Sequence, residues 1–159
     1  MRGFLDRDYL KTRDGLFFCV VGCEHPQNLV IAYPKYAPGP GPWRRGRVSF
    51  SRLLREYSMG ELEKALNALS EVYVKRLEEL DTIMSAVPLE RVAKHFKPEK
   101  RLEEVLRGEG RDRLEQELAE LACELSNQTS VRTCHLGVTG SILIGIHGPH
   151  SDIDLVVYG

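Results

Sequence analysis

The sequence lacks an excess of charge of either sign and any long apolar run. Its 159 residues include 22 Lys and Arg against 23 Asp and Glu, for a formal net charge of −1. This balance provides no global attraction to nucleic acid or to an anionic membrane, so any contact with a polyanion depends on a local patch. The longest apolar run, Leu16 to Cys23, is far too short to span a bilayer. We therefore expect no membrane partner.

The first residues, MRGFLDRDYLKTRDG, also lack the pattern of a secretory leader. Charged side chains occur from the start, and no apolar core is followed by small residues at a cleavage site. Signal peptides need both features. We therefore expect a cytoplasmic protein.

Cysteine is scarce, with Cys19, Cys23, Cys123 and Cys134 as its four positions. Disulfide bonds are rare in the cytosol outside hyperthermophiles. On a strand, Cys19, Cys23 and His25 would share one face and offer three ligands for zinc, but no fourth ligand is evident. We favour buried free thiols over a zinc site.

The first third of the chain has the pattern of an antiparallel sheet. LFFCVVGC and LVIAYPKY are runs of apolar, β-branched and aromatic residues, separated by the turn-forming EHPQN. Residues 8–14 form a candidate preceding strand that turns at Asp14-Gly15. Pro34 indicates an edge strand or a bulge, because proline has no N–H for the ladder.

A proline- and glycine-rich segment, APGPGPWRRGR, covers residues 37–47. Alternating proline and glycine cannot hold a helix or a central strand, so we predict an exposed loop. Trp43 with Arg44, Arg45 and Arg47 could stack on a base and neutralise phosphates, which makes nucleic acid a candidate partner. A solvated hairpin tip is the simpler interpretation, and we favour it.

The rest of the chain alternates helical and short extended patterns. We predict strands at Val72–Val74 and Thr82–Val87, which would extend the first sheet. Capping residues and apolar periodicity predict four helices. The first begins at a capping box of Ser58 and Glu61 and ends near Ser70, and the second begins at Pro88. The third runs from Pro98 to about Arg107, and the fourth from Arg111 to Asn127.

The last 23 residues, GVTGSILIGIHGPHSDIDLVVYG, contain the polar residues of greatest interest. A strand at residues 133–138 is predicted to lead into Gly140 and Ser141. Glycine allows a ligand to approach the backbone closely, and Ser141 is a good N-cap for a short helix over residues 142–146. Free N–H groups at such a turn suit phosphate.

A second strand is predicted from Asp152 to Tyr158. Side chains alternate along a strand, so Asp152 and Asp154 share one face and the apolar Ile153, Leu155 and Val157 share the other. Two carboxylates about 7 Å apart at Cα can ligate hard cations such as Mg²⁺, which would hold a triphosphate on the Gly140-Ser141 turn. We interpret His147 and His150 as turn residues rather than ligands.

The Gly140-Ser141 pair, ten residues and then Asp152-Ile153-Asp154 resemble the signature of the polymerase-beta-type nucleotidyltransferase superfamily. The similarity is greatest to small archaeal proteins with a nucleotidyltransferase domain, and it extends to upstream stretches. The resemblance implies that Gly140 and Ser141 bind a nucleoside triphosphate. It also implies that Asp152 and Asp154 are the catalytic carboxylates and ligate two Mg²⁺ ions.

Two departures from the superfamily pattern matter for the site. Members often have arginines just after the Gly-Ser pair, where this chain has Ile142, Leu143 and Ile144. The negative charge of the phosphates would then be neutralised by a metal ion, by His147 or His150, or by groups elsewhere in the chain. The superfamily also uses a third carboxylate on a later strand, which these residues do not include. We therefore expect part of a longer nucleotidyltransferase.

We expect an α+β fold, with a small antiparallel sheet and helices followed by the opening part of a nucleotidyltransferase fold. Residues 1–110 would form the N-terminal region, and 111–159 a partial nucleotidyltransferase-like domain. Two strands are marginal by themselves, so we predict self-association through the C-terminal strand. The expected reaction is Mg²⁺-dependent transfer of a nucleoside monophosphate to an unknown acceptor. The alternative is a non-catalytic nucleotide-binding, metal-binding or protein-interaction module.

Overall fold

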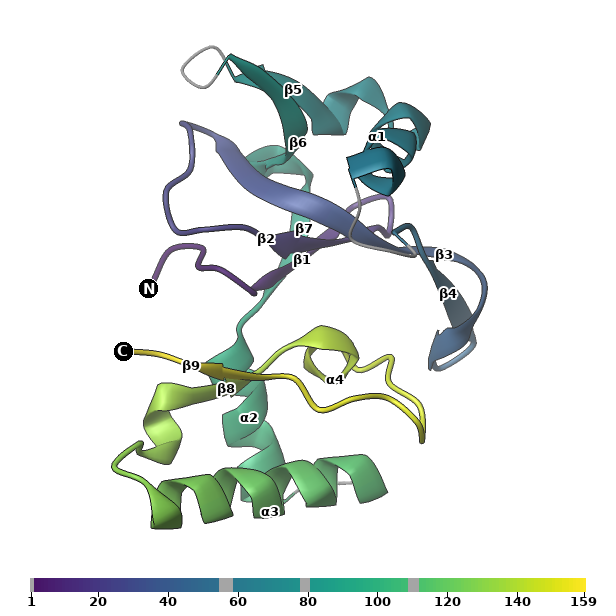
Figure 1. Cartoon of the computed structure of the whole chain (residues 1–159). Coiled ribbons are helices and arrows are strands. Elements are labelled where there is room, and N and C mark those ends of the chain that lie inside the picture. Colours follow the sequence, from purple (N-terminus) through teal and green to yellow (C-terminus); the bar gives the residue numbers. More distant parts are fainter. Residues whose placement is uncertain (1, 55–58, 78–80, 109–111) are drawn as a thin grey trace. The chain divides into compact units, whose positions relative to one another are not determined.

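The computed structural model describes residues 2–54, 59–77, 81–108 and 112–159 (Figure 1). Contacts between residues divide the chain into two compact units. The first unit consists of residues 1–42 and 48–95, and the second of residues 43–47 and 96–159. The chain is α+β, as predicted, with an antiparallel sheet and helices. No helix among the described residues is long and apolar enough to cross a membrane.

A curled antiparallel sheet forms most of the first unit. Its strands are β1 (Tyr9–Thr12), β2 (Phe17–Val20), β3 (Leu29–Arg45), β4 (Val48–Arg52), β5 (Val74–Leu77), β6 (Thr82–Pro88) and β7 (Val92–Phe96). They run in the order β5-β6-β3-β2-β1-β7, and β4 pairs with β3. The predicted hairpins are confirmed, and β6 extends the sheet by pairing with β3.

The prediction at Pro34 is confirmed as a bulge. Phe17 lies opposite Tyr36 and Phe18 lies opposite Pro34, so the register shifts by one residue between them. The extra residue is Lys35, and a bulge of this kind leaves room for a proline inside a sheet. β3 can therefore lie between β2 and β6 rather than at an edge.

The loop predicted over residues 37–47 is wrong for most of its length, because β3 continues to Arg45 and pairs with β4. Pro38, Pro40 and Pro42 occupy alternate positions, so all three missing N–H groups fall on one edge of the strand. Gly41 approaches β4 so closely that a Cβ would overlap the Phe50 carbonyl oxygen. The hairpin tip itself is confirmed and turns at Gly46, which has a φ of +59°.

Helical segments of the first unit are short. Helix α1 spans Met59–Ala68, and single 3₁₀ turns occupy Glu71–Tyr73 and Leu89–Arg91. Ser58 of the predicted capping box lies outside the described residues. The helix predicted from Pro88 is wrong: one turn is followed at once by β7, because β7 pairs with β1 and the Arg13 N–H donates to the Arg91 carbonyl at 3.0 Å.

Three helices and a two-stranded sheet form the described part of the second unit. Its elements are α2 (Pro98–Arg107), α3 (Arg113–Gln128), a 3₁₀ turn (Thr133–His135), β8 (Leu136–Val138), α4 (Gly140–Ile144) and β9 (Leu155–Val157). Both longer helices were predicted, α2 from Pro98 and the glycines after Arg107, and α3 from its apolar stripe. Helix α2 ends at Gly108, whose φ of 88° suits the left-handed C-cap. Asp112 caps α3 by accepting the Glu115 N–H at 3.0 Å.

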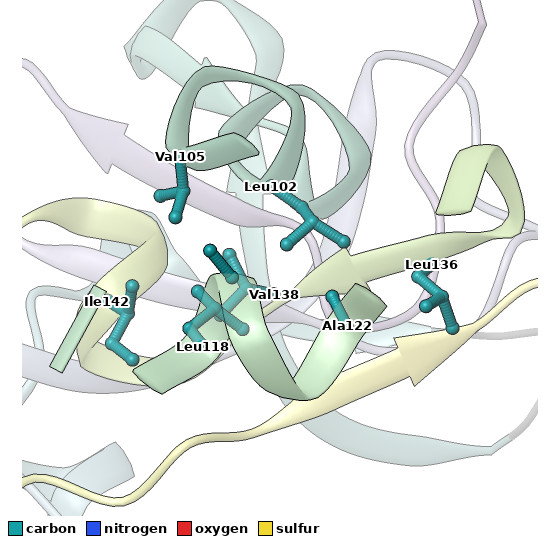
Figure 2. Packing of buried hydrophobic residues seen from close by; sticks show 8 residues of the cluster. Leu102, Val105, Leu118, Ala122, Leu136, Val138 and Ile142 are labelled. Atoms are coloured by element: carbon teal, nitrogen blue, oxygen red, sulfur yellow. The ribbon is translucent and has the colours of Figure 1, made fainter. Parts of the chain in front are cut away.

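One apolar cluster holds the second unit together (Figure 2). Its buried side chains come from both long helices, from β8 and from α4: Leu102, Val105, Leu118, Ala119, Ala122, Leu136, Val138 and Ile142. Burial of these apolar side chains supplies the main stabilising free energy of the unit. Helix α2 thus groups with the C-terminal elements, whereas the sequence suggested domains of 1–110 and 111–159. That domain assignment stays a prediction.

Only one of the four cysteines behaves as predicted. All four are free; Cys19 is buried in β2, whereas Cys23, Cys123 and Cys134 are exposed, so the prediction of buried thiols is wrong for these three. Cys23 is exposed because β2 ends at Val20 and the chain turns away at Gly22, with a φ of +73°. Within the described ranges, no group of three His, Cys, Asp or Glu side chains is placed to hold a metal.

Candidate functional site

Pairing of β8 with β9 brings the two halves of the terminal motif together (Figure 1). The strands are antiparallel, with Val138 opposite Leu155. The next pair continues this register, because the Thr139 N–H donates to the Asp154 carbonyl at 2.9 Å. Asp154 is therefore held beside the residue at which α4 begins.

Gly140 and the Asp154 carboxylate are in direct contact. Gly140 has a φ of +70°, in the left-handed region that disfavours side chains, and a Cβ added there would collide with Asp154 Oδ2. Glycine at position 140 is thus required twice, once by the backbone and once by the carboxylate. The close backbone approach predicted for Gly140 is made by Asp154.

Ser141 lies within α4 rather than at its N-cap. The helix begins one residue earlier, at Gly140, and Thr139 occupies the N-cap position. The predicted range of residues 142–146 and the capping role of Ser141 are therefore wrong. The cause is the left-handed conformation of Gly140, which turns the chain into the helix before Ser141. Ser141 is buried, and its carbonyl accepts the Ile146 N–H at 3.0 Å.

Asp152 and Asp154 precede β9 instead of lying within it, because the regular strand covers only Leu155–Val157. The alternation predicted from the sequence persists: both aspartates are exposed, and Ile153 and Leu155 pack against the apolar cluster. The two carboxylates therefore lie on the face that points away from this cluster.

Val157 does not share the core face as predicted, since it is 61% exposed. The apolar cluster contacts only Ile153 and Leu155 in this part of the chain, so the end of β9 is left uncovered. Self-association through this strand stays a prediction.

Neither carboxylate of the pair has a neutralising partner in the described part of the chain. Among the residues that the structure describes, none forms a hydrogen bond or an ion pair with the side chain of Asp152 or Asp154. Exposed oxygen ligands of this kind fit Mg²⁺, which usually takes one or two carboxylates and completes its octahedron with water and substrate phosphates. The donor set therefore suits a metal that arrives together with a nucleotide.

A network that the sequence analysis missed holds the turn before Asp152. The His147 side chain is only 8% exposed, and its Nε2 lies 2.7 Å from Asp112 Oδ2 and 4.0 Å from Glu115 Oε1. Arg101 in α2 pairs with Glu115 and donates from Nε to the Ile142 carbonyl at 3.3 Å. The capping position of Asp112 was the only local signal for this network.

Electrostatics favour the charged form of Asp112. Its partial burial favours the neutral acid, but hydrogen bonds from the Glu115 backbone N–H and from His147 outweigh burial and lower the pKa of the carboxyl. His147 is thus a positioning residue that ties the turn to the start of α3. His150 is exposed in the same turn, as predicted, and lines a surface pocket of about 490 Å³ beside Arg113.

The tip of the β3–β4 hairpin belongs to the second unit and contacts the end of α4. The Arg44 N–H donates to the Ile146 carbonyl at 3.2 Å, and Arg45 Nη1 donates to the Ile144 carbonyl at 3.3 Å. The Arg45 guanidinium also lies 6.0 Å from the centre of the Phe96 ring. The structure thus brings arginines next to the helix that lacks them in its own sequence.

Comparison with known proteins yields one informative similarity. No protein-family profile matches the chain, and no solved structure matches it. The uncharacterized protein MJ1086 of Methanocaldococcus jannaschii is 32% identical over 160 residues, which cover 96% of this chain and 47% of that protein. The chain therefore spans about half the length of this curated relative. The similarity is to an archaeal protein, and nucleotidyl transfer stays a proposal.

Proposed function

We propose that this chain carries the nucleotide- and metal-binding half of a nucleotidyltransferase site. The whole protein would transfer a nucleoside monophosphate from a nucleoside triphosphate to an acceptor that is still unknown, in the cytoplasm. The observation that supports this most is the contact of the Asp154 carboxylate with Gly140. It unites the glycine turn and the acidic pair, the two parts of the motif on which the resemblance rests.

The charge of the site supports the same proposal. Asp152 and Asp154 would hold Mg²⁺, which when bound neutralises and orients the triphosphate. Gly140, without a side chain, lets the Asp154 carboxylate lie against the turn, which would place the metal and a phosphate on it beside α4. Ile153 and Leu155, packed in the core, would keep the two carboxylates on the solvent face.

A binding module without turnover is the second candidate. It is favoured by the ligand set, because the described residues include no group of three side chains that could hold a metal. Two carboxylates suffice for a nucleotide-bound Mg²⁺, whereas transfer in the superfamily is expected to need a third.

Binding of ATP to the chain, with and without Mg²⁺, tests the proposal by titration calorimetry. We expect Mg²⁺-dependent binding that is lost in the double variant Asp152→Asn with Asp154→Asn. The matched control is Glu117→Gln with Glu120→Gln, which removes the same charge from exposed positions on α3 and should bind like the original chain. Equal binding by the aspartate variant would contradict the proposed site.

Release of pyrophosphate separates the two candidates. Release that requires Mg²⁺, a nucleoside triphosphate and both aspartates would establish transfer chemistry. Aspartate-dependent binding without any release would establish the binding module for this chain. The same assay on a chain with the length of the archaeal relative would then show whether later residues supply the missing group.

A further inference from the structure

We propose that the hairpin tip is a binding surface for the phosphate backbone of a single-stranded nucleic acid. The arginine tip is defined as Trp43, Arg44, Arg45, Gly46 and Arg47. We further infer that this strand is the acceptor of the transferred nucleoside monophosphate, and this part rests on the proposed function. The binding itself rests on charge, anchoring and exposure.

Charge is distributed unevenly along this nearly neutral chain. From His25 to Arg55 there is no acidic residue, and the six Lys and Arg residues in that stretch are Lys35, Arg44, Arg45, Arg47, Arg52 and Arg55. Within the described ranges, no carboxylate forms an ion pair with Arg44, Arg45 or Arg47. The charges of these three arginines are therefore not paired with any described carboxylate.

The tip is held in place by backbone contacts that leave charged groups available. Arg44 uses its backbone N–H, and Arg45 uses one guanidinium nitrogen, to bind carbonyls at the end of α4. The Arg44 and Arg47 side chains are exposed. Guanidinium groups bind phosphate oxygens bidentately and stay charged at every relevant pH. Because the tip is anchored, the main loss of freedom on binding a phosphate is that of the two arginine side chains.

Position favours a strand over a free nucleotide. The arginine tip contacts the C-terminal end of α4, and the Gly140–Asp154 contact lies at its other end, about 7 Å away for five helical residues. A free nucleoside triphosphate has only three phosphates, whereas a strand continues beyond the site. A strand that ends at the site places further phosphates within a few ångströms of one another, and these would reach the tip. Trp43, the aromatic residue of the tip, is half-buried beside these arginines.

Fluorescence anisotropy tests this with the whole chain and a labelled single-stranded RNA oligonucleotide in EDTA, without nucleotide. We expect binding that weakens with salt. Arg44→Ala with Arg47→Ala should lower the association constant at least about tenfold and reduce the salt slope by about 1.4, which is 0.7 for each lost phosphate contact. The control, Arg113→Ala with Arg132→Ala, removes the same charge from exposed positions of the same unit and should bind within about twofold.

Three results would overturn the proposal: no binding of RNA or of the matching single-stranded DNA, equal loss in both double variants, or loss of Mg²⁺-dependent ATP binding without loss of RNA binding. The last would assign the tip to the nucleotide instead. Because the RNA assay contains no metal, its result does not depend on Asp152 or Asp154. Failure of the proposed nucleotide site would therefore be seen separately, in the calorimetric titration of the aspartate variant.

Discussion

Asp8 in the first unit and the pair Asp152 and Asp154 in the second unit have opposite environments. In the first unit, Asp8 is fully buried and accepts hydrogen bonds from Arg2 at 2.6 and 2.8 Å and from the Leu5 N–H at 3.0 Å. His95 Nε2 lies 2.6 Å from the same group. In the second unit, Asp152 and Asp154 are exposed and, as far as the structure describes the chain, unpartnered.

The difference separates a carboxylate with a structural role from the two that we propose bind a ligand. Burial favours the neutral form of Asp8, but the hydrogen bonds outweigh it and hold the pKa of this carboxyl below its usual value. The oxygens of Asp8 therefore bind groups of the protein itself. Under the proposed function, the oxygens of Asp152 and Asp154 would instead bind a ligand, and their exposed positions make unpaired carboxylates inexpensive in folding free energy.

Truncation of a core side chain in the second unit should have the largest effect on the unfolding free energy. Leu118 is fully buried at the centre of the apolar cluster, so we expect Leu118→Ala to cost about 2–5 kcal/mol of unfolding free energy in urea denaturation. Leu121, on the same helix and 36% exposed, is the control, with a change within about 0.5 kcal/mol for Leu121→Ala. Similar losses for the two variants would contradict this assignment of the core.

Removing the buried charge of the first unit should cost about 3 kcal/mol, because Asp8→Asn removes the carboxylate that pairs with Arg2. Urea denaturation measures the loss. Asp6 is exposed and forms a surface ion pair with Arg7 at 3.3 Å, so Asp6→Asn should cost less than about 1 kcal/mol. A small loss at Asp8 would mean that its network is not structural, and the contrast between the units would fail.

The stabilisation by Asp8 should also depend on pH. Its folded-state pKa is lowered, so the stabilisation is present above the unfolded value of about 3.9 and is lost as pH falls through the lower folded value. The difference in unfolding free energy between the original chain and Asp8→Asn should therefore narrow as pH falls from about 5 to about 2. A gap that stays constant over this range would contradict the cause given for the pKa shift.

The glycines at the two ends of α4 test the role of the Asp154 contact within the second unit. Both have positive φ, +70° at Gly140 and +66° at Gly145, so alanine at either should cost about 1–2 kcal/mol in strain. An added Cβ collides with Asp154 only at Gly140; at Gly145 it meets no described atom within 4 Å. We expect Gly140→Ala, but not Gly145→Ala, to weaken Mg²⁺-dependent nucleotide binding. Equal binding by both would argue against the contact as part of a site.

The smallest effect on stability is expected at the aspartate pair. Replacing Asp152 and Asp154 by asparagine removes like charges that have no partner in the described protein, so the unfolding free energy should change by less than about 0.5 kcal/mol. Thermal and urea denaturation would measure this beside the binding assay. A loss as large as that for Asp8→Asn would make the pair structural.

Local pattern predicted much of the fold. Alternation and turn residues predicted β1, β2 and β6. Apolar periodicity predicted α3, because this helix buries one continuous face, and Pro98 with the glycines after Arg107 predicted α2. The prediction was wrong where pairing decided the structure. Residues after Pro88 have no strong strand pattern, yet they become β7 because β1 offers a ladder, and the proline-rich arm of β3 is held extended by β4.

The candidate site divides in the same way. From the sequence alone, the spacing of Asp152 and Asp154 places both carboxylates on one face. The link between Asp112 and His147 had no comparable signal, because the two residues lie 35 positions apart and meet only after α3 and the final turn have packed.

The sequence by itself determined the elements with strong periodicity and the shared face of the two aspartates, since both follow from backbone geometry within a few residues. Only the tertiary structure decided that Asp154 meets Gly140, because the register of β8 on β9 sets that contact. It also decided that Arg45 reaches Ile144, 99 positions away. Contacts over such separations depend on strand pairing and core packing, which no local pattern specifies.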